Sequence, residues 1–536
     1  MVSFTDEQED IIGSTSHDYT FVQAFAGTGK TTTLLEYANR NSSQKILYLT
    51  FNTSLANCEN IKNTENIDSY TIHGFAFQEL GYEEIEINKM SLKYLRNLYD
   101  VDTRYANSIR RAFNYFLAST NRKPKIRHVL ETDNTGLQNP EEILNFIIDL
   151  YDGMESGKYD MSHDFYLKKY ILMKPVLKYD IILVDESQDL SPCVLKLLAI
   201  QDCKRVFVGD VYQQIYQFRN VINPFDYMDQ FDDSVLLHLT KTFRYGHDVC
   251  ELSNAFLGTY TTNKSKIVCA SECKTDIYSN SCTLPSKYTF ISRTNRGLID
   301  KAVELSKKNQ YFDLFDKMYN FKKEKEIYEL LSRSTKKKLD SELSELVGKK
   351  FGHVSSLDEL KDLVIEFQNF KWLNRILICE KYKENIWELI ETHFVKDSDI
   401  ILMNAHQSKG LEFDNVVLGN DFKQLVHKTG KYSKFYQEDE YNLLYVAMTR
   451  AKKRLYINEN IKKFLRKYYD NSIERKYGIT NRCHECGCET DMIISHTMER
   501  LPDYVRPNHR ISVHYCSLCA DGYIDSITAD PKFYRK

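Results

Sequence analysis

The stretch FVQAFAGTGKTTTLLEYANR, residues 21–40, decides the fold. It begins with a strand-like apolar run from Phe21 to Phe25, passes through a glycine-containing turn, and continues as a helical pattern from Thr31 to Arg40. A second buried strand is expected from Ile46 to Phe51. Because strands that are joined through a helix usually run parallel, this order predicts a parallel sheet covered by helices.

The same alternation returns further along the chain, and two long segments interrupt it. The later strands are expected at residues 181–184, 205–208, 288–292, 399–403 and 416–418. Residues 82–166 read as mostly helical and partly basic, and residues 301–395 as Lys/Glu-rich helix without strand signals. We therefore predict an α/β protein with two parallel-sheet domains, each of which carries a helical insertion.

The composition is that of an ordinary globular protein. The 536 residues are 42% hydrophobic and 27% charged, which excludes a disordered or fibrous chain. The 72 basic and 75 acidic residues give a net charge of −3, so a nucleic acid would have to bind in a local basic groove. No apolar run approaches the ~20 residues of a membrane span, and the acidic start, MVSFTDEQED, is not a signal peptide. The 13 cysteines then indicate reduced thiols or metal ligands in an intracellular protein of the nucleus or cytoplasm, without a membrane partner.

The turn after the first strand has the pattern of a phosphate-binding loop. Gly27 and Gly29 allow backbone N–H groups to approach phosphate oxygens, and the following helix contributes its positive dipole end. Lys30 is expected at the β- and γ-phosphates and Thr31 at Mg²⁺. The expected nucleotide contacts here are Ala26, Gly27, Thr28, Gly29, Lys30, Thr31 and Thr32. A chance glycine-rich turn is the alternative.

A pair of acids follows another apolar strand. In IILVDE, residues 181–186, the carboxylate of Asp185 suits the metal ion and that of Glu186 suits the general base that activates water. Two acids after a strand can also cap the next helix. Together with the phosphate loop, however, the pair predicts an ATPase or GTPase.

The motifs and their order then carry a family resemblance. The chain resembles the UvrD/Rep-like superfamily-one helicases, and within them the F-box DNA helicase branch, although no F-box is recognisable. In the first half, Gln8 of FTDEQ matches the adenine contact and Gln213 of GDVYQQIYQFR matches a γ-phosphate sensor. The residues that match single-stranded DNA contacts in this half are Phe51, Asn52, Thr71, His73, Tyr216, Phe218 and Arg219.

The second half continues the same series of motifs. Phe243 matches an aromatic that stacks on adenine, and Arg244 and Arg450 match two arginines that contact the γ-phosphate. The motif HQSKGLEF supplies nucleotide contacts at Gly410 and Glu412. The expected DNA contacts in this half are Arg293, Asn295 and His406. The chain departs from the family pattern at Thr32, where Arg is common, and at Phe218, where Trp is commoner.

The resemblance implies two RecA-like motor domains with ATP hydrolysed between them. Its predicted parts are 1–81 with 167–240 (first motor domain), 82–166 (insertion), 241–300 with 396–461 (second motor domain), 301–395 (insertion), a basic linker 462–478 and a tail 479–536. It further implies a monomeric, ATP- and Mg²⁺-dependent DNA helicase that moves 3′→5′ on single-stranded or tailed duplex DNA in replication, repair or recombination. A translocase that strips proteins with little unwinding and a non-catalytic DNA-binding adaptor are the alternatives, and RNA remains open as a substrate.

The tail predicts a structural zinc site. Cys483, Cys486, Cys516 and Cys519 form two C-x-x-C pairs, and four thiolates favour tetrahedral Zn²⁺. Four protein ligands leave no open position for water, so we expect a role in docking on DNA or on a protein partner. Redox-active dithiols or unligated thiols are the alternative.

Two further patterns concern the first insertion and a group of cysteines. The basic residues of 104–128 could follow phosphates; they are Arg104, Arg110, Arg111, Arg122, Lys123, Lys125 and Arg127. The helical spacing of Ala112, Phe113, Phe116 and Leu117 favours a core stripe over base stacking. For Cys250, Cys269, Cys273 and Cys282, buried free thiols are favoured over a metal or iron–sulfur site.

Overall fold

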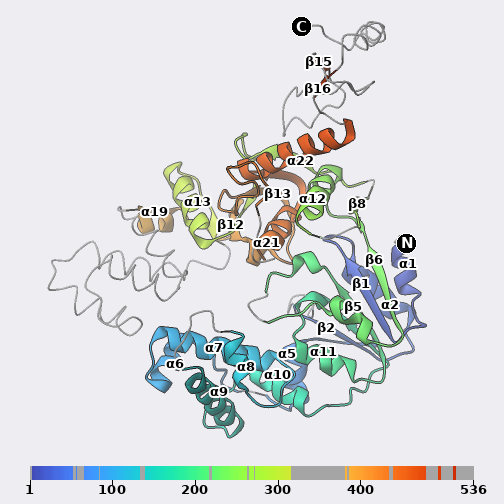
Figure 1. The fold of residues 1–536 in the computed structure, drawn as a ribbon, viewed down its shortest axis with the longest axis vertical. Helices are drawn as coiled ribbons and strands as arrows, with labels where there is room; N and C mark the ends of the chain where they lie inside the picture. Colours follow the sequence, from blue (N-terminus) through green and yellow to red (C-terminus); the bar gives the residue numbers. More distant parts are fainter. Residues whose placement is uncertain are drawn as a thin grey trace, which may run out of the picture. The chain divides into compact units, whose positions relative to one another are not determined.

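The structure is a computed structural model of the chain (Figure 1). It describes residues 3–51, 56, 65–83, 85–132, 139–216, 220–261, 265–270, 272–314, 381–382, 386–433, 439–477, 493–496 and 511–514. The chain has two compact units, of which the first contains residues 1–243 and 302–396 and the second contains residues 244–301 and 397–536. No helix within the described ranges is long and apolar enough to span a bilayer.

The first unit is built on a six-stranded parallel sheet, which confirms the predicted fold class for this half. Its strand order is β3-β2-β4-β5-β1-β6. The strands are β1 (Tyr19–Ala24), β2 (Ile46–Thr50), β3 (Ile67–Thr71), β4 (Ile181–Val184), β5 (Lys204–Gly209) and β6 (Ser234–Leu239). The two edge strands, β3 and β6, are only partly buried, and the apolar-run criterion did not predict them.

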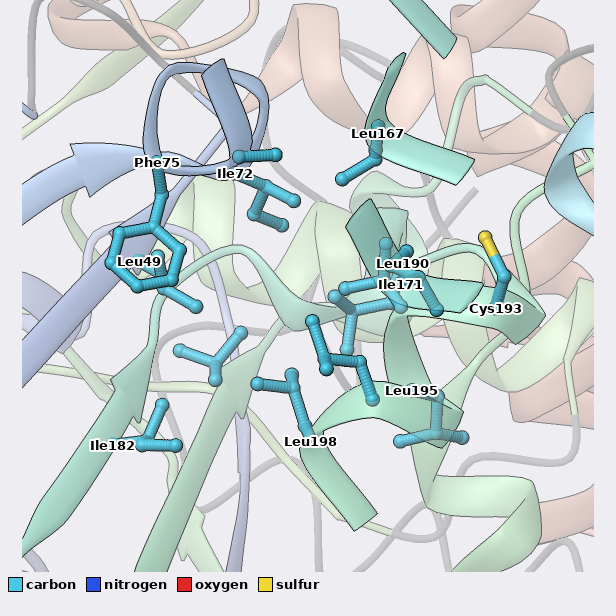
Figure 2. Packing of buried hydrophobic residues seen from close by; sticks show 14 of the residues in the cluster. Leu49, Ile72, Phe75, Leu167, Ile171, Ile182, Leu190, Cys193, Leu195 and Leu198 are labelled. Carbon is cyan, nitrogen blue, oxygen red and sulfur yellow. The ribbon is translucent and has the colours of Figure 1, made fainter. Parts of the chain in front are cut away.

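Helices cover both faces of this sheet. On one face lie α1 (Asp6–Ile12) and α2 (Lys30–Arg40), and Leu34 and Tyr37 of α2 join Tyr48 of β2 in one buried cluster. On the other face, α5 (Ile72–Glu79), α10 (His163–Leu172) and α11 (Pro192–Ala199) pack on Leu49 and Ile182 (Figure 2). Successive residues of β2 therefore enter different cores, as strand alternation requires.

Four helices between α5 and α10 form a group with its own core (Figure 1). They are α6 (Leu92–Tyr99), α7 (Thr103–Ala118), α8 (Ile126–Leu130) and α9 (Pro140–Glu155). The predicted core stripe is confirmed, because Ala112, Phe113, Phe116 and Leu117 are all buried. Lys168 of α10 places its ammonium 3.4 Å from the carbonyl oxygen of Phe116, where a cation suits the C-terminal end of α7.

Short 3₁₀ helices lie in the connections between the strands of this sheet. They are η1 (Ser187–Asp189), η2 (Val211–Gln213) and η4 (Pro224–Gln230). The first follows β4 and the second follows β5, so both lie where parallel strands present their functional residues.

A second sheet of the same class has most of its strands in the second unit, and it confirms the predicted pair of parallel sheets. The strand order is β11-β12-β10-β13-β14-β9. The strands are β9 (Asp276–Ser279), β10 (Tyr288–Ser292), β11 (Asp313–Leu314), β12 (Ile400–Asn404), β13 (Phe413–Leu418) and β14 (Ala451–Ile457), and two further short strands are β7 (Lys241–Thr242) and β8 (Val268–Cys269). The expectation that 301–395 lacks strands was wrong at β11, where buried Phe312 and Leu314 alternate with Asp313.

The helices of the second half are α12 (His247–Tyr260), α13 (Asn295–Lys307), α19 (Ile386–His393), α20 (Ala405–Ser408), α21 (Asp439–Met448) and α22 (Glu459–Tyr477). The predicted basic linker thus coincides with α22, whose Ile461, Phe464 and Leu465 are buried. The finer division of the chain into motor domains and insertions remains a prediction.

The tail contributes one described feature, an antiparallel pair of strands. Strands β15 (Ile493–His496) and β16 (Ile511–His514) pair between the two predicted cysteine motifs. All four predicted zinc ligands, Cys483, Cys486, Cys516 and Cys519, lie outside the described residues.

Candidate functional site

The turn between β1 and α2 has the backbone of a phosphate cradle. Gly27 and Gly29 have φ angles of 77° and 80°, a left-handed conformation that glycine adopts without strain. A Cβ atom on Gly29 would come 3.0 Å from Nε2 of Gln8. The Thr28 hydroxyl donates to the carbonyl of Phe25 at 2.9 Å and braces the turn. Since Gly29 brings no side-chain acceptor to the first N–H groups of α2, this helix end is suited to an anion.

Asp185 lies at the carboxyl end of β4 and is fully buried. Its Oδ2 accepts hydrogen bonds from the Thr31 hydroxyl at 2.9 Å and from the Tyr48 hydroxyl at 2.7 Å. Its Oδ1 accepts the backbone N–H of Glu186 at 2.8 Å. Burial raises the pKa of Asp185, and the neighbouring Glu186 carboxylate adds to that effect. A hydroxyl and a carboxylate side by side are the hard oxygen ligands that Mg²⁺ prefers, so these residues fit the predicted ion.

Glu186 is held in place by its backbone and by two side chains. Its φ of 56° is left-handed, which is uncommon for a non-glycine residue and often found at functional positions. Its Oε1 lies 3.8 Å from Nζ of Lys30, and its Oε2 accepts a hydrogen bond from Nε2 of Gln188 at 2.5 Å. The carboxylate is therefore fixed beside the phosphate loop, where a general base for water is required.

Gln188 links this acid to the motif after β5. Besides its donation to Glu186, its Oε1 accepts the backbone N–H of Asp210 at 3.0 Å. Asp210 in turn accepts a hydrogen bond from Nε2 of Gln213 at 2.6 Å. A Cβ atom on Gly209 would lie 2.6 Å from Oε1 of Gln188, so the link depends on glycine there. The predicted γ-phosphate sensor, Gln213, is thus connected to the predicted base through two buried residues.

Gln8 and Phe243 both lie beside the phosphate loop. Gln8 closes a capping box with Thr5, and its Nε2 donates to the hydroxyl of Thr33 at 3.1 Å. The N–H of Phe243 donates to the carbonyl of Gly27 at 2.8 Å, while its side chain is 45% exposed. An accessible aromatic face next to a side-chain amide is suited to a purine base.

In the second unit, the predicted nucleotide residues form their own charged group. Nε of Arg244 lies 3.1 Å from Oε2 of Glu412, and Nζ of Lys452 lies 3.4 Å from Oε1. Burial alone would raise the pKa of Glu412, but the charges of Arg244 and Lys452 outweigh it and lower the pKa. Gly410 precedes this group with a φ of 81°.

Arg450 is deeply buried, with 1% of its surface exposed. Its Nε donates to the carbonyl of Val446 at 2.9 Å and its Nη1 to that of Leu411 at 3.1 Å. These bonds hold the guanidinium against backbone oxygens of the second unit. Its contact with a γ-phosphate stays a prediction.

Three predicted DNA contacts of the first unit, Phe51, Thr71 and His73, lie at the carboxyl edge of its sheet. Phe51 follows β2 and Thr71 ends β3, and the two strands pair up to Thr50 and Thr71. Thr71 caps α5, and Nε2 of His73 in the first turn of that helix lies 2.9 Å from Oδ1 of Asp164. Tyr216 lies beyond η2, and Asn52, Phe218 and Arg219 are outside the described residues.

The corresponding residues of the second unit also follow strand ends. Arg293 comes after β10 and His406 after β12, and these strands pair side by side. Nε of Arg293 lies 2.6 Å from Oε2 of Glu440, so its guanidinium is engaged by a carboxylate. Oδ1 of Asn295 accepts a hydrogen bond from Asn404 at 3.1 Å.

The described cysteines of the loose cluster are free thiols, as predicted, although Cys250 is the one among them that is buried; they are Cys250, Cys269, Cys273 and Cys282. Burial raises the pKa of the Cys250 thiol, and Cys269 contributes as a neighbour. Across the described part of the chain, no group of three or more His, Cys, Asp and Glu side chains is arranged to hold a metal ion.

Sequence reasoning missed Tyr48 as part of this site, and it gave no role to Gln188 and Asp210, although both lie within matched motifs. A signal for Tyr48 existed, because a hydroxyl in a fully buried strand needs a hydrogen-bond partner. The partner itself could not be identified without the strand register.

A phosphate cradle and a buried acid on one parallel sheet, with a second sheet of the same type in the chain, define a P-loop protein with two RecA-like sheets. Residues 35–462 match the model of the UvrD-like helicase C-terminal domain. The chain belongs to this UvrD-like helicase family, as the sequence motifs indicated.

Two named relatives extend the match. F-box DNA helicase 1 of Gallus gallus is 28% identical over 511 residues, which cover 87% of this chain and 50% of the relative. F-box DNA helicase protein 1 of Schizosaccharomyces pombe is 30% identical over 496 residues, which cover 82% of this chain and 56% of the relative. The chain thus spans about half the length of these relatives.

Proposed function

We propose that this protein is an ATP-dependent DNA helicase or translocase that moves 3′→5′ on single-stranded DNA. The observation that carries the proposal is the convergence of Lys30, Thr31, Asp185 and Glu186 at one end of the first sheet. Membership of the UvrD-like family and the likeness to two F-box DNA helicases support DNA as the substrate.

The residues divide the work of hydrolysis. Lys30 and the N–H groups of the glycine turn bind the phosphates, and Thr31 and Asp185 hold Mg²⁺. Bound Mg·ATP supplies the phosphoanhydride bond that is cleaved. Glu186 takes the proton of the attacking water. Gln213 contacts the γ-phosphate, so its position depends on whether ATP has been hydrolysed, and the DNA-contact motif follows it directly in the chain.

The second unit completes the proposal. Arg244 and Arg450 would stabilise negative charge on the transferred phosphoryl group, which is the usual role of arginine in phosphoryl transfer. Binding and release of ATP would then change the relative position of the two units, and alternating grips on DNA would produce steps. We further propose that the protein acts as a monomer on single-stranded and tailed duplex DNA, in replication, repair or recombination.

We also propose that Cys483, Cys486, Cys516 and Cys519 bind one structural Zn²⁺. Two C-x-x-C pairs support this, and the strands β15 and β16 between them resemble the excursion of a zinc ribbon. The role of the module would be docking on DNA or on a protein partner.

One experiment tests the function directly. ATP turnover is measured with single-stranded DNA, with single-stranded RNA and without nucleic acid, and unwinding is then measured on 3′- and 5′-tailed duplexes. We expect turnover stimulated by DNA and unwinding from 3′ tails. Unwinding only from 5′ tails would refute the polarity, stimulated turnover without unwinding would favour the protein-stripping translocase, and no turnover would favour the adaptor.

A further inference from the structure

Tyr48 lies in the middle of β2, a strand whose residues are all buried. Its ring belongs to the cluster formed with α2, together with Leu34 and Leu183. Its hydroxyl reaches beyond this apolar cluster to Oδ2 of Asp185 at 2.7 Å. A tyrosine with an apolar body and one polar tip is therefore placed with the tip on the acid of the candidate metal site.

The acceptor is what makes this contact more than the usual pairing of a buried hydroxyl. Tyr37, another buried tyrosine in the same cluster, directs its hydroxyl to the backbone carbonyl of Ser14 at 3.4 Å. Tyr48 instead donates to a carboxylate that also accepts from Thr31 at 2.9 Å. Hydrogen bonds to charged groups are about twice as strong as neutral ones.

The three donors around Asp185 fix its orientation completely. Glu186 donates its backbone N–H to Oδ1, while Thr31 and Tyr48 share Oδ2. Thr31 has one hydroxyl proton, which Oδ2 receives, and its lone pairs are left for a cation. The Tyr48 hydroxyl also interacts with the side chain of Thr31, and the Tyr48 ring is held by the packing of a central strand.

We propose that Tyr48 is a positioning residue for the magnesium site, holding the Asp185 carboxylate in the orientation that binds Mg²⁺ with the nucleotide. This inference rests on the proposed ATP-dependent function and adds a residue to it. Outer groups that orient a metal-ligating carboxylate typically change metal affinity by 10- to 100-fold when they are removed.

The test uses Tyr48→Phe, which removes one oxygen and keeps the ring. Binding of a fluorescent ATP analogue to the full chain is followed by anisotropy while free Mg²⁺ is varied, and again in EDTA. We expect the half-saturating Mg²⁺ concentration to rise about tenfold, with metal-free nucleotide affinity unchanged. Tyr37→Phe is the matched control, because it removes the same atom from the same cluster, and it should behave as wild type.

A second variant tests whether Tyr48 affects Mg²⁺ binding through Asp185. In an Asp185→Ala background both acceptor oxygens are gone, so Tyr48→Phe should produce no further change in the Mg²⁺ dependence. A Mg²⁺ midpoint within twofold of wild type, or an equal shift in Tyr37→Phe, would assign Tyr48 to the core alone and overturn the proposal.

The readout also separates this inference from the proposed function. A wild-type chain that binds Mg·nucleotide without hydrolysing it would contradict the activity, while the Tyr48 comparison would still decide the role of the hydroxyl. A wild-type chain whose nucleotide binding ignores Mg²⁺ would overturn the positioning role itself.

Discussion

Replacing Glu186 by Gln isolates the chemistry of the candidate base from nucleotide binding. The change keeps the size of the side chain and the contact of its Oε1 with Lys30, but it removes the negative charge. In the structure that charge lies 3.8 Å from the ammonium of Lys30. Glu186→Gln therefore removes a proton acceptor and weakens the attraction on the Lys30 ammonium in one step.

The lost charge and the lost base act in opposite directions, the first on nucleotide binding and the second on the rate of hydrolysis. At 3.8 Å and an effective dielectric constant of about 20, the attraction between Lys30 and Glu186 is about 4 kcal/mol before desolvation. Losing it leaves Lys30 available for phosphate, so ATP affinity should be kept or increased. Loss of a general base typically slows the chemical step by about 10²- to 10⁴-fold, which corresponds to roughly 3–5 kcal/mol.

The substitution also changes the pKa of the neighbouring Asp185. The Glu186 carboxylate contributes to the raised pKa of Asp185, second only to burial. Neutralising it lowers the pKa of Asp185 toward the ordinary value, so the metal-binding carboxylate should be ionised at lower pH in the variant. Retained nucleotide affinity is therefore expected to extend further into the acid range than in wild type.

The assay pairs single-turnover hydrolysis with equilibrium binding of a fluorescent ATP analogue. Glu36→Gln is the control, because it makes the same chemical change on α2, where Glu36 pairs with Arg40 at 3.0 Å outside the cradle. Lys30→Ala should lose both binding and turnover. Wild-type turnover in Glu186→Gln would remove Glu186 as the base, and equal loss of binding would make its charge structural.

Three further predictions concern other parts of the molecule. Phe243→Ala should weaken ATP binding by about tenfold, because the exposed ring that flanks the phosphate loop is lost; unchanged affinity would remove it as an adenine contact. Burial lowers the pKa of His128 from 6.5 to about 4. The neutral imidazole therefore adds to the free energy of unfolding above pH 6.5, and this contribution is lost as the pH falls from 6.5 toward 4. Wild type should lose roughly 2 kcal/mol between pH 7 and 5 from this group, His128→Gln should lose less in urea denaturation, and parallel curves would contradict the assignment. Elemental analysis should find one zinc per chain, and less than half an equivalent, or undiminished zinc after Cys483 and Cys516 are both changed to Ser, would refute the zinc site.

The fold was predictable where burial is strong on both faces of a strand. Strands β2, β4 and β10 are wholly buried and appear in the sequence as continuous apolar runs. Strands β9, β11 and β14 were also missed, and β14 lies inside its sheet. The missed strands β3 and β6 lie at the sheet edges, where one side lacks a neighbour. Their residues are largely half-buried, so polar side chains interrupt the apolar signal.

The site was predictable where its residues are contiguous. Lys30 and Thr31 belong to one turn, and Asp185 and Glu186 end one strand, so local pattern and chemistry identify them together. The link from Glu186 through Gln188 to Asp210 joins the ends of two strands. Its existence depends on the order of strands in the sheet, which no short sequence window contains.

The register of β2 against β4 decides whether Tyr48 meets Asp185 at all. Tyr48 pairs with Leu183 and Leu49 with Val184, and the N–H of Asp185 donates to the carbonyl of Leu49 at 2.9 Å. A slip by one residue would turn Tyr48 to the face that packs on α5 and leave the acid without this donor. Burial of a leucine is worth about 2 kcal/mol and the hydrogen bond about 1–3 kcal/mol, and β2 buries apolar side chains in both cores. The packing of the two faces therefore sets the register, and the contact between Tyr48 and Asp185 follows from it.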